Sequence, residues 1–506
     1  MSHRTTNTWL VARHGTARRS AMCDRAVRRI ATPVLLAVAL TLVSACGGSD
    51  SDAQQPSPSP TRTQGTGTTP VRLPAPEGFD ATRGWSTKAS PETPDVQAGS
   101  SGFPLVAVAP RSKLVVQAAE DASRVQAYDL ATGKVAWTFT PAALSDARTG
   151  VFVVTVGGRE QVLLARQGKT SGDGLKQSAP TVTVDIIPAD SPAKATAAHH
   201  LDLPVPSDRA LSFAASGSGF LVGAADHGTY SQATVIDPAT GAKRSVTAKD
   251  VTVPGCGGAT CTLRATPAFA TSAGVVSTYQ QTTGCDRWGN GSGQPCTTGF
   301  QVGDAWTSTT TAPRGMHTGI PLAVTGKYLI AAWHTSDSQT DQPALSADSK
   351  TTFTVQDLAT GKRIASVSCT SADQLTLQPG SAQSSTRTSA NGRYLVSGQT
   401  AFDLNSRTGR CYTSSASSKG IDFTAVGDDG TAYGLIHTGD GSDASSLYGR
   451  LPIAPDGTDS TEQGARVDLA AGSAKALSEA AEVPIYLAAS DGVFRTGDVL
   501  AVYARR

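Results

Sequence analysis

The chain has 506 residues, with 43 Lys and Arg against 41 Asp and Glu. Residues 1–45 carry seven arginines and one aspartate, which leaves 36 basic and 40 acidic residues in the remainder, a formal net charge of −4. A mildly acidic chain without a basic stripe argues against nucleic-acid binding, which needs clustered cations. It also argues against polybasic attachment to anionic lipid headgroups.

The start of the chain has the order of a secretory signal. Basic residues from Arg25 to Arg29 precede the apolar run 30–43, which is shorter than the ~20 apolar residues of a membrane-spanning helix. This order, followed by small residues, is typical of a signal peptide, and translation from either Met1 or Met22 would retain it. A plain N-terminal membrane anchor and an ordinary cleaved signal are the alternatives.

Cys46 follows the apolar run directly, after the small residues Ser44 and Ala45. Small residues before a cysteine at the end of a secretory leader resemble the lipobox of bacterial lipoproteins. The resemblance implies cleavage between Ala45 and Cys46 and attachment of a diacylglyceryl group to the Cys46 thiol. Residues 1–45 are therefore predicted to be a lipoprotein signal peptide, and the protein to be lipid-anchored at the extracytoplasmic face of the cell membrane.

Residues 46–77 are predicted to be a lipidated, disordered tether. The segment is rich in Pro, Ser and Thr, including the run 56–60, and has almost no apolar side chains to bury. Burial therefore cannot offset the entropy that ordering would cost. Pro-rich spacers extend by ~3 Å per residue, so the tether would hold the following domain well away from the membrane.

Residues 78–506 have the composition of an all-β domain. The full chain has 51 Gly, 28 Pro and 3 Met, and short apolar runs such as 105–108, 151–154 and 219–222 recur between turn residues. Runs of this kind are typical of strands. Because the domain is long and its strands are short, a closed repeat architecture is favoured over a single sandwich.

A turn motif recurs between these runs, most clearly in residues 125–137. Asp at the start of the turn can accept backbone N–H bonds, and Gly supplies a residue with φ > 0 that lets an antiparallel strand return. The predicted turns have their Asp and Gly at Asp129 and Gly133, Asp237 and Gly241, Asp357 and Gly361, Asp403 and Gly409, and Asp468 and Gly472.

The motif resembles the repeat of pyrroloquinoline-quinone-like (PQQ-like) propellers, A-x-D-x-x-T-G-x-x-x-W. Asp129, Thr132, Gly133 and Trp137 match it fully, whereas the other copies keep Asp and Gly without the Trp. The resemblance implies an all-β fold, a β-propeller of four-stranded blades, for residues 78–506.

Tiling the apolar runs favours eight blades, with seven as the alternative. The last run, 485–503, supplies only about three strands before the chain ends. We expect the missing outer strand to come from residues 84–87, which include a Trp. Pairing of the two ends would close the ring and remove exposed strand edges.

Six cysteines follow Cys46, an even number that predicts disulfides in an exported protein. Zinc is the rival interpretation, but it favours C-x₂₋₄-C units, a spacing that Cys285 and Cys296 do not have. The pairs predicted are Cys256 with Cys261, Cys285 with Cys296 and, by elimination, Cys369 with Cys411.

The PQQ-like family includes quinoprotein dehydrogenases, whose calcium-bound quinone lies in the central funnel, in some of them under adjacent cysteines. This chain has no adjacent cysteines. Its histidines lack the H-E-x-x-H spacing and are interpreted as surface residues. Asp428, Asp429 and Gly430 are interpreted as a turn, with calcium ligation as the alternative. We therefore predict no enzyme activity and assign no catalytic residue, metal or cofactor.

Arg287 and Trp288, between Cys285 and Cys296, are the candidate binding residues, because Arg and Trp are enriched at binding hot spots. A Trp that covers a blade edge is the alternative. With the anchor and tether, they favour a non-catalytic binding or scaffold module for an envelope protein, peptide or glycan; propeller lipoproteins of the outer-membrane barrel-assembly family resemble this plan. The alternative function is a quinone-dependent dehydrogenase or another enzyme that uses the propeller funnel.

Overall fold

The residues that can be described lie in the second of two compact units, which begins at Arg62 and ends at Arg506. In this computed structural model they are residues 72–89, 103–119, 121, 123–170, 178–204, 211–224, 232–251, 263–281, 298–316, 318–335, 350–370, 379–380, 382–415, 418–437 and 463–506. Among them, no helix is long and apolar enough to cross a membrane. Several predicted sites fall outside these ranges: Ala45, Cys46, Cys256, Cys261, Cys285, Arg287, Trp288 and Cys296.

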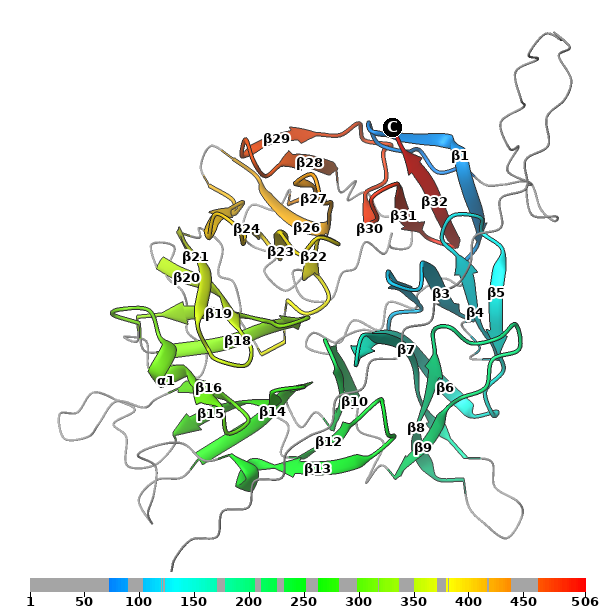
Figure 1. The fold of residues 1–506 in the computed structure, drawn as a ribbon, viewed down its shortest axis with the longest axis horizontal. Coiled ribbons are helices and arrows are strands. Elements are labelled where there is room, and N and C mark those ends of the chain that lie inside the picture. The colour runs from blue at the N-terminus through cyan, green and yellow to red at the C-terminus, as the bar shows by residue number, and fades with distance from the viewer. Residues whose placement is uncertain are drawn as a thin grey trace, which may run out of the picture. The chain divides into compact units, whose positions relative to one another are not determined.

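The described strands form six four-stranded sheets and one eight-stranded sheet, mostly of consecutive antiparallel strands (Figure 1). The first three sheets along the chain contain β2 (Val106–Ala109), β3 (Leu114–Ala118), β4 (Val125–Asp129) and β5 (Val135–Phe139); β6 (Ser145–Val156), β7 (Arg159–Lys169), β8 (Pro180–Pro188) and β9 (His199–Pro204); and β10 (Leu211–Ser216), β11 (Gly219–Ala224), β12 (Gln232–Ile236) and β13 (Lys243–Thr247), with the 3₁₀ turn η1 (Ala248–Asp250) after them.

The next sheet contains β14 (Leu263–Thr271), β15 (Gly274–Gln281), β16 (Thr298–Val302) and β17 (Trp306–Thr307), followed by the short helix α1 (Ser308–Thr311). The eight-stranded sheet contains β18 (Thr318–Thr325), β19 (Tyr328–His334), β20 (Lys350–Asp357), β21 (Arg363–Thr370), β22 (Arg387–Thr388), β23 (Tyr394–Ser397), β24 (Thr400–Asp403) and β25 (Thr408–Cys411). The last two contain β26 (Gly420–Val426), β27 (Thr431–His437), β28 (Gly464–Asp468) and β29 (Ser473–Ala476); and β30 (Pro484–Leu487), β31 (Asp491–Thr496), β32 (Val499–Arg505) and β1 (Phe79–Lys88).

The eight-stranded sheet consists of two four-stranded meanders, β18–β21 and β22–β25, whose outer strands β21 and β25 lie side by side. A single parallel bridge between Ser366 and Thr408 joins them. We call each four-stranded unit a blade and name it by its strands. Counting these two meanders as separate blades is an interpretation, and eight therefore stays the predicted blade number.

Each blade packs against the next one along the chain, and the two ends of the domain complete the ring. Strand β1 pairs antiparallel with β32, so that Trp85 lies opposite Val502 and Lys88 opposite Val499. This pairing puts residues 84–87 in the outer strand of the last blade, next to blade β2–β5. The all-β propeller fold predicted from the sequence is confirmed.

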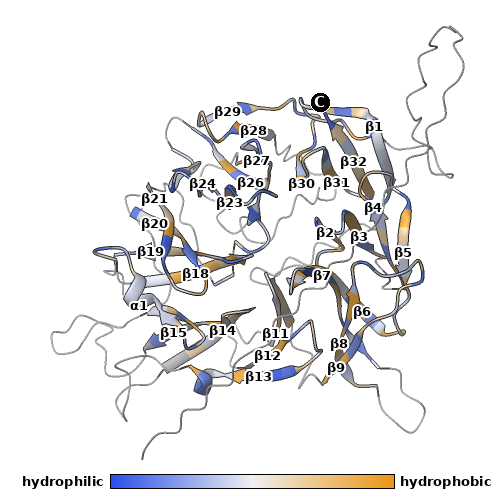
Figure 2. Cartoon of the chain, viewed as in Figure 1, coloured by the Kyte–Doolittle hydropathy of each residue, from blue (hydrophilic) through white to orange (hydrophobic). Residues whose placement is uncertain are grey.

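The hydrophobic core is divided among the interfaces between neighbouring blades. One cluster joins Val116 and Trp137 of blade β2–β5 to Val162 and Leu164 of blade β6–β9, and similar clusters follow around the ring. Figure 2 shows hydrophobic stretches along β6 and β18 and hydrophilic residues on the outer strand β13. Inner strands are therefore covered on both faces by neighbouring blades, which explains their continuous apolar runs.

The predicted Asp-to-Gly turns connect the third and fourth strands of their blades. In the turn after β4, Asp129 accepts the backbone N–H of Thr132 at 2.8 Å and its hydroxyl at 2.7 Å, while Gly133 donates to the Asp129 carbonyl at 2.8 Å. The glycine lies four residues after the aspartate and has φ of +68°. The positive φ is shared by the Gly residues of three further turns, Gly241, Gly361 and Gly472.

The prediction is wrong at Gly409. Asp403 does accept N–H groups of Asn405 and Ser406, but the residue with positive φ is Arg407, at +60°. Gly409 lies two residues later, within β25, where it pairs with Phe402 of β24. The left-handed position is the fourth residue after the aspartate in each of these turns, so in this copy a non-glycine residue occupies it.

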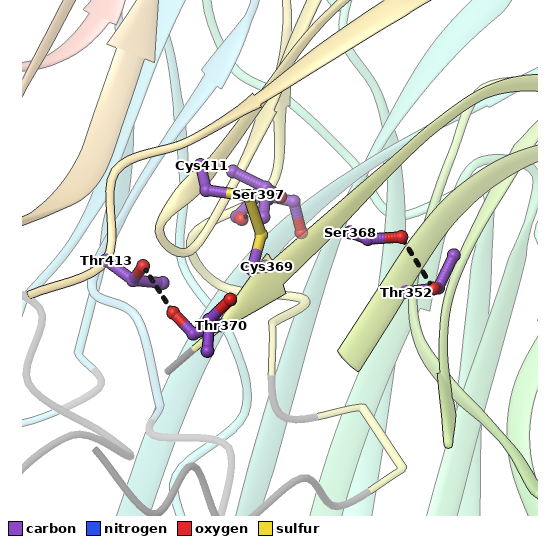
Figure 3. The surroundings of a disulfide bond; sticks show 8 residues. Thr352, Ser368, Cys369, Thr370, Ser397, Cys411 and Thr413 are labelled. Carbon is purple, nitrogen blue, oxygen red and sulfur yellow. Dashed lines mark hydrogen bonds between the residues drawn. A yellow bond between two sulfur atoms is a disulfide. The ribbon is translucent and has the colours of Figure 1, made fainter. Parts of the chain in front are cut away.

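Cys369 and Cys411 form a disulfide with an S–S distance of 2.05 Å, the pairing expected by elimination (Figure 3). Cys369 is buried near the end of β21, and Cys411 is the last residue of β25. Close to it, the Thr413 hydroxyl donates to the Thr370 carbonyl at 3.4 Å. The disulfide thus links the outer strands of blades β18–β21 and β22–β25, where only one parallel bridge joins the two strands.

Replacing Cys369 by Ala is expected to lower the free energy of unfolding by about 4 kcal/mol, because the disulfide closes a loop with a sequence separation of 42 residues. Urea unfolding of the oxidised protein would measure this. Cys411→Ala and the double substitution should give the same loss, since either change breaks the one bond. A clearly larger loss in the double variant would contradict this account.

Candidate functional site at the ring axis

The first strand of each blade lies nearest the centre of the ring, and one segment of the chain lies inside it against β18. Between β21 and β22, Gly380 donates its N–H to the Pro321 carbonyl at 3.1 Å, and Ala382 donates to the Leu322 carbonyl at 3.2 Å. We call residues 379–380 and 382–386 the axial segment. These two hydrogen bonds hold the axial segment, whose backbone consists mostly of turns, against the inner edge of β18.

Gln383 is the residue of the axial segment whose side chain forms hydrogen bonds with two blades. Its side-chain carbonyl accepts the Val324 N–H at 2.8 Å, and its side-chain N–H donates to the Val324 carbonyl at 3.0 Å. The same amide nitrogen donates to the Ala215 carbonyl of β10 at 3.0 Å. Because blade β14–β17 lies between β10 and β18 around the ring, Gln383 joins two blades that are not neighbours. Both strands reach the centre of the ring in Figure 1.

Arg387 follows the axial segment and also crosses between blades that are not neighbours. Its Nη1 donates to the Thr386 carbonyl at 2.9 Å, and its Nε donates to the Ile485 carbonyl of β30 at 3.5 Å. Blade β26–β29 lies between β22 and β30 in the ring. The side chain is half-buried, and burial lowers the pKa of Arg387 to about 10, so the guanidinium stays charged at neutral pH.

Tyr486 on β30 is a third polar residue of this region. Burial raises its pKa to about 12, and the negative charges of Glu160 and Asp428 add to the shift. Both carboxylates accept backbone N–H groups. Glu160 accepts those of Arg111 and Ser112 at 3.0 and 2.7 Å, and the contacts of Asp428 are given below. A phenol with this pKa stays neutral at physiological pH.

Asp428 and Asp429, the alternative calcium ligands, take part in turn contacts. Asp428 accepts the Asn391 N–H at 2.7 Å. Asp429 receives Arg505 Nη2 at 2.7 Å and the hydroxyl of Thr431 at 3.1 Å. The carboxylate of Asp429 is thus neutralised by an arginine, which fits the turn interpretation.

A second charged cluster crosses blade β6–β9. Arg166 on β7 and Asp185 on β8 are buried, with side chains 1% and 4% exposed, and Arg166 Nη2 lies 3.3 Å from Asp185 Oδ2. Arg166 Nη1 also donates to the Ala142 carbonyl at 2.5 Å. His200 on β9 places Nδ1 2.6 Å from Asp185 Oδ1 and Nε2 3.4 Å from Asp202 Oδ1. This charge chain runs from the blade interior to solvent.

The hydrogen bond to Asp185 raises the pKa of His200, with the charges of Asp185 and Asp202 adding to it and burial and Arg166 opposing it. A raised pKa in the folded state stabilises the fold fully below the unfolded pKa of ~6.5, and this contribution is lost as pH rises through the folded pKa. We expect the Tm difference between wild type and His200→Gln to shrink between pH 6 and pH 8.5. Thermal unfolding across this range would measure it; a constant difference would contradict it.

The interpretation of the histidines as surface residues is wrong for His334, which is 5% exposed. It lies at the end of β19, where Thr351 Oγ1 is 3.3 Å from its Nδ1, and burial lowers its pKa to about 4. The side chain is therefore neutral at physiological pH. The signal in the sequence was the position of His334 directly after the apolar run 328–333.

Four of the predicted turn glycines are covered by a side chain of the preceding blade, and of these side chains sequence reasoning had singled out only the Trp of residues 84–87, as part of the closing strand. Trp85 covers Gly133 of the next blade and donates its indole N–H to the Leu130 carbonyl at 2.9 Å. Trp306 covers Gly361 in the same way and donates to the Leu358 carbonyl at 2.9 Å. A Cβ at either glycine would collide with the indole, so these turns require glycine for packing as well as for φ.

Other residue types take the tryptophan's place at two further blade junctions. His199 lies over Gly241, with Nε2 3.2 Å from the Ala239 carbonyl oxygen. Arg410 lies over Gly472 and donates from Nη2 to the Ala470 carbonyl at 3.4 Å. Each of these side chains is on the outer strand of the preceding blade. The predicted turns are therefore structural joints between blades.

The two faces of the ring differ in the connections that they carry. Antiparallel strands place the turns after the first and third strands of a blade at one face, which we call the turn face. The ends of the remaining connections lie at the opposite face, the long-loop face; they include the end of β19 and the start of β20, and the end of β27 and the start of β28. Arg287 and Trp288 belong to the connection between β15 and β16, whose ends lie at the long-loop face, but are themselves outside the described residues.

No protein-family model matches the chain, and no curated protein matches it. Solved structures with similarity include the Dos1 propeller (10% identity over 77% of this chain and 75% of that one, TM-score 0.30), Porphyromonas gingivalis dipeptidyl peptidase 4 (10%, 81% and 58%, TM-score 0.38) and the dihydro-heme d1 dehydrogenase NirN (14%, 74% and 65%, TM-score 0.32). The chain thus spans less than two thirds of the last two proteins. At these identities and TM-scores the matches assign no activity, and the propeller assignment rests on the strand order described above.

Proposed function

We propose that the protein is a membrane-anchored extracytoplasmic lipoprotein whose β-propeller is a non-catalytic binding or scaffold module for an envelope protein, peptide or glycan. The lipobox resemblance around Cys46 and the Pro-rich tether support the anchored position. The inter-blade disulfide Cys369–Cys411 is compatible with an oxidising compartment outside the cytoplasm.

The axial segment is the observation that supports a binding role over catalysis in this proposal. An enzyme that uses the propeller funnel needs space between the inner strands for its substrate or cofactor. Here Gln383 extends from β18 to β10 and Arg387 from β22 toward β30, so less of that space is left for a group as large as a quinone, although a carboxylate is smaller. Contacts with a partner would then use the long-loop face, where the longer connections leave the blades.

Partner capture tests the proposal. The full-length chain, with an affinity tag at its C-terminus, would be crosslinked in intact cells and purified from detergent-solubilised membranes. We expect a specific envelope component in the wild-type sample, and its depletion when Arg287 and Trp288 are both replaced by Ala. The matched control replaces Arg393 and Val135, which lie on described blades away from that connection, and should retain the component. Capture of no component, together with quinone- and calcium-dependent dye reduction by the purified protein, would overturn the proposal.

Replacing Cys46 by Ala is expected to abolish incorporation of a palmitate analogue and to release the protein from the membrane fraction, because the thiol is the predicted attachment point. In-gel fluorescence after labelling, together with membrane fractionation, measures both. Replacement of Cys23, which lies within the predicted signal peptide, is the matched control and should leave labelling unchanged. Equal labelling of the Cys46 variant and the wild type would sink the lipoprotein assignment.

A further inference from the structure

We propose that the ring axis contains an oxyanion site in which Arg387 binds a carboxylate group. The residue belongs to β22, the inner strand of blade β22–β25, and its side chain crosses toward β30 on a blade that is not its neighbour. The side chain is half-buried among the inner strands. This location puts a permanent positive charge at the centre of the propeller.

Arg387 differs from three other arginines of the described residues, each of which has a carboxylate partner. The buried Arg166 is paired with Asp185, and the partly exposed Arg393 and Arg505 are paired with Asp403 and Asp429. No carboxylate of the described residues forms an ion pair with Arg387, whose two hydrogen bonds both go to main-chain carbonyls. Partial burial of a cation without an opposite charge costs free energy, and a bound anion would offset that cost.

The geometry of the guanidinium suits a carboxylate. Nε donates to the Ile485 carbonyl and Nη1 donates one hydrogen to the Thr386 carbonyl, which leaves the second Nη1 hydrogen and both Nη2 hydrogens without a partner among the described residues. These donors form the planar fork that binds a carboxylate through two parallel bonds. The two carbonyls fix the plane of the fork before a ligand arrives. A single positive charge also matches a carboxylate better than a phosphate, which carries a larger charge at neutral pH.

The inference goes beyond the proposed function and does not depend on the partner. The carboxylate has two possible sources, a small acid from solution or an acidic group of a peptide that enters the axis. A chain that captures no envelope component could still bind carboxylate, and a chain that binds its partner at the long-loop face could leave the axis empty. Failure of one proposal is therefore distinguishable from failure of the other.

The test uses the full-length chain in detergent micelles, with thermal unfolding followed by fluorimetry at pH 7.5 and constant ionic strength. Exchange of chloride for acetate is expected to raise the Tm of the wild type, by a few degrees at an acetate concentration about 100 times its Kd. Arg387→Met should lose this response, and Arg387→Lys, which keeps the charge without the fork, should lose most of it. Arg393→Met is the matched control and should respond as the wild type does.

Two further arms identify the source and the alternative ligand. An acetylated, amidated hexapeptide with one Glu is compared with its Gln counterpart; a response to the Glu peptide at concentrations far below that of acetate indicates a peptide source. Phosphate replaces acetate in the other arm and is expected to give the smaller response. Equal acetate responses of wild type and Arg387→Met would overturn the site. A wild type whose Tm does not respond to acetate would also overturn the site. If Arg387→Met and Arg387→Lys then both lower Tm, the role of Arg387 is structural alone.

Discussion

Replacing Asp185 by Asn is expected to lower the free energy of unfolding by about 3–5 kcal/mol, as measured by urea unfolding at pH 7. The substitution keeps the shape of the side chain but removes the charge that faces both Arg166 and His200. Arg166 is 1% exposed, so it would be left as a buried cation without an opposite charge in contact, with the Ala142 carbonyl as its remaining partner. Breaking a buried pair by removing one member is more damaging than the pair's net contribution to stability, because the remaining charge pays its full desolvation cost.

Asp202 provides the matched control, since it lies on the same blade and is 70% exposed. Asp202→Asn should cost at most about 1 kcal/mol, as exposed ion pairs usually do. The double replacement Arg166→Met with Asp185→Leu removes both buried charges and should recover much of the stability lost in Asp185→Asn. A loss below about 1 kcal/mol for Asp185→Asn would show that the pair is not desolvated in solution.

Local sequence patterns predicted the parts of the fold that local chemistry determines. The turn after β4 forms because Asp129 and Gly133 are both within one turn of chain, so no distant residue is needed. The closing strand around Trp85 could be predicted because the last blade was one strand short. The pairing of Cys369 with Cys411 followed from counting cysteines, although the parallel contact of their two outer strands could not be foreseen.

Features that depend on contacts across the ring could not be predicted in this way. Gln383 lies in a polar run that resembles an ordinary loop, and its role requires both β10 and β18 to reach the axis. Arg387 looks like a surface cation in the sequence for the same reason. The error at Gly409 has a local cause, because the residue four positions after Asp403 is Arg407, and glycine two residues later was mistaken for it.

The charged cluster of blade β6–β9 needed strand register before it could be recognised. Arg166, Asp185 and His200 lie on three successive strands, and each is an unremarkable polar residue within its own strand. Asp185 pairs directly with His200 across β8 and β9. Register is set by the turn and loop lengths between strands, and the connection 170–179 between β7 and β8 is too long for its Asp-Gly pair alone to fix the register.

Deleting residues 79–88 from the full-length chain is expected to prevent formation of a cooperatively folded monomer. The deletion removes β1, whose ladder with β32 extends from Phe79 to Lys88, and leaves β32 with a free edge, a template for pairing with other chains. It also removes Phe79, which is 3% exposed and packs on Phe494; loss of one buried Phe alone costs about 3–5 kcal/mol. Because domains are stable by only about 5–15 kcal/mol, the combined loss approaches the whole stability.

The ring-closure account predicts a difference between two deletions of equal length. Removing residues 50–59 from the predicted tether should leave Tm unchanged, whereas removing residues 79–88 should give oligomers by size-exclusion chromatography with light scattering and no sharp thermal transition. Trp85→Ala tests the contact between blades apart from the pairing of β1. The β1–β32 ladder is retained in this variant, but the contact with Gly133 and the hydrogen bond to the Leu130 carbonyl are lost. This variant should stay monomeric with a lower Tm. A monomeric deletion variant whose Tm lies within about 2 °C of the wild type would show that the remaining blades fold without closure of the ring, and that β1 only covers an edge.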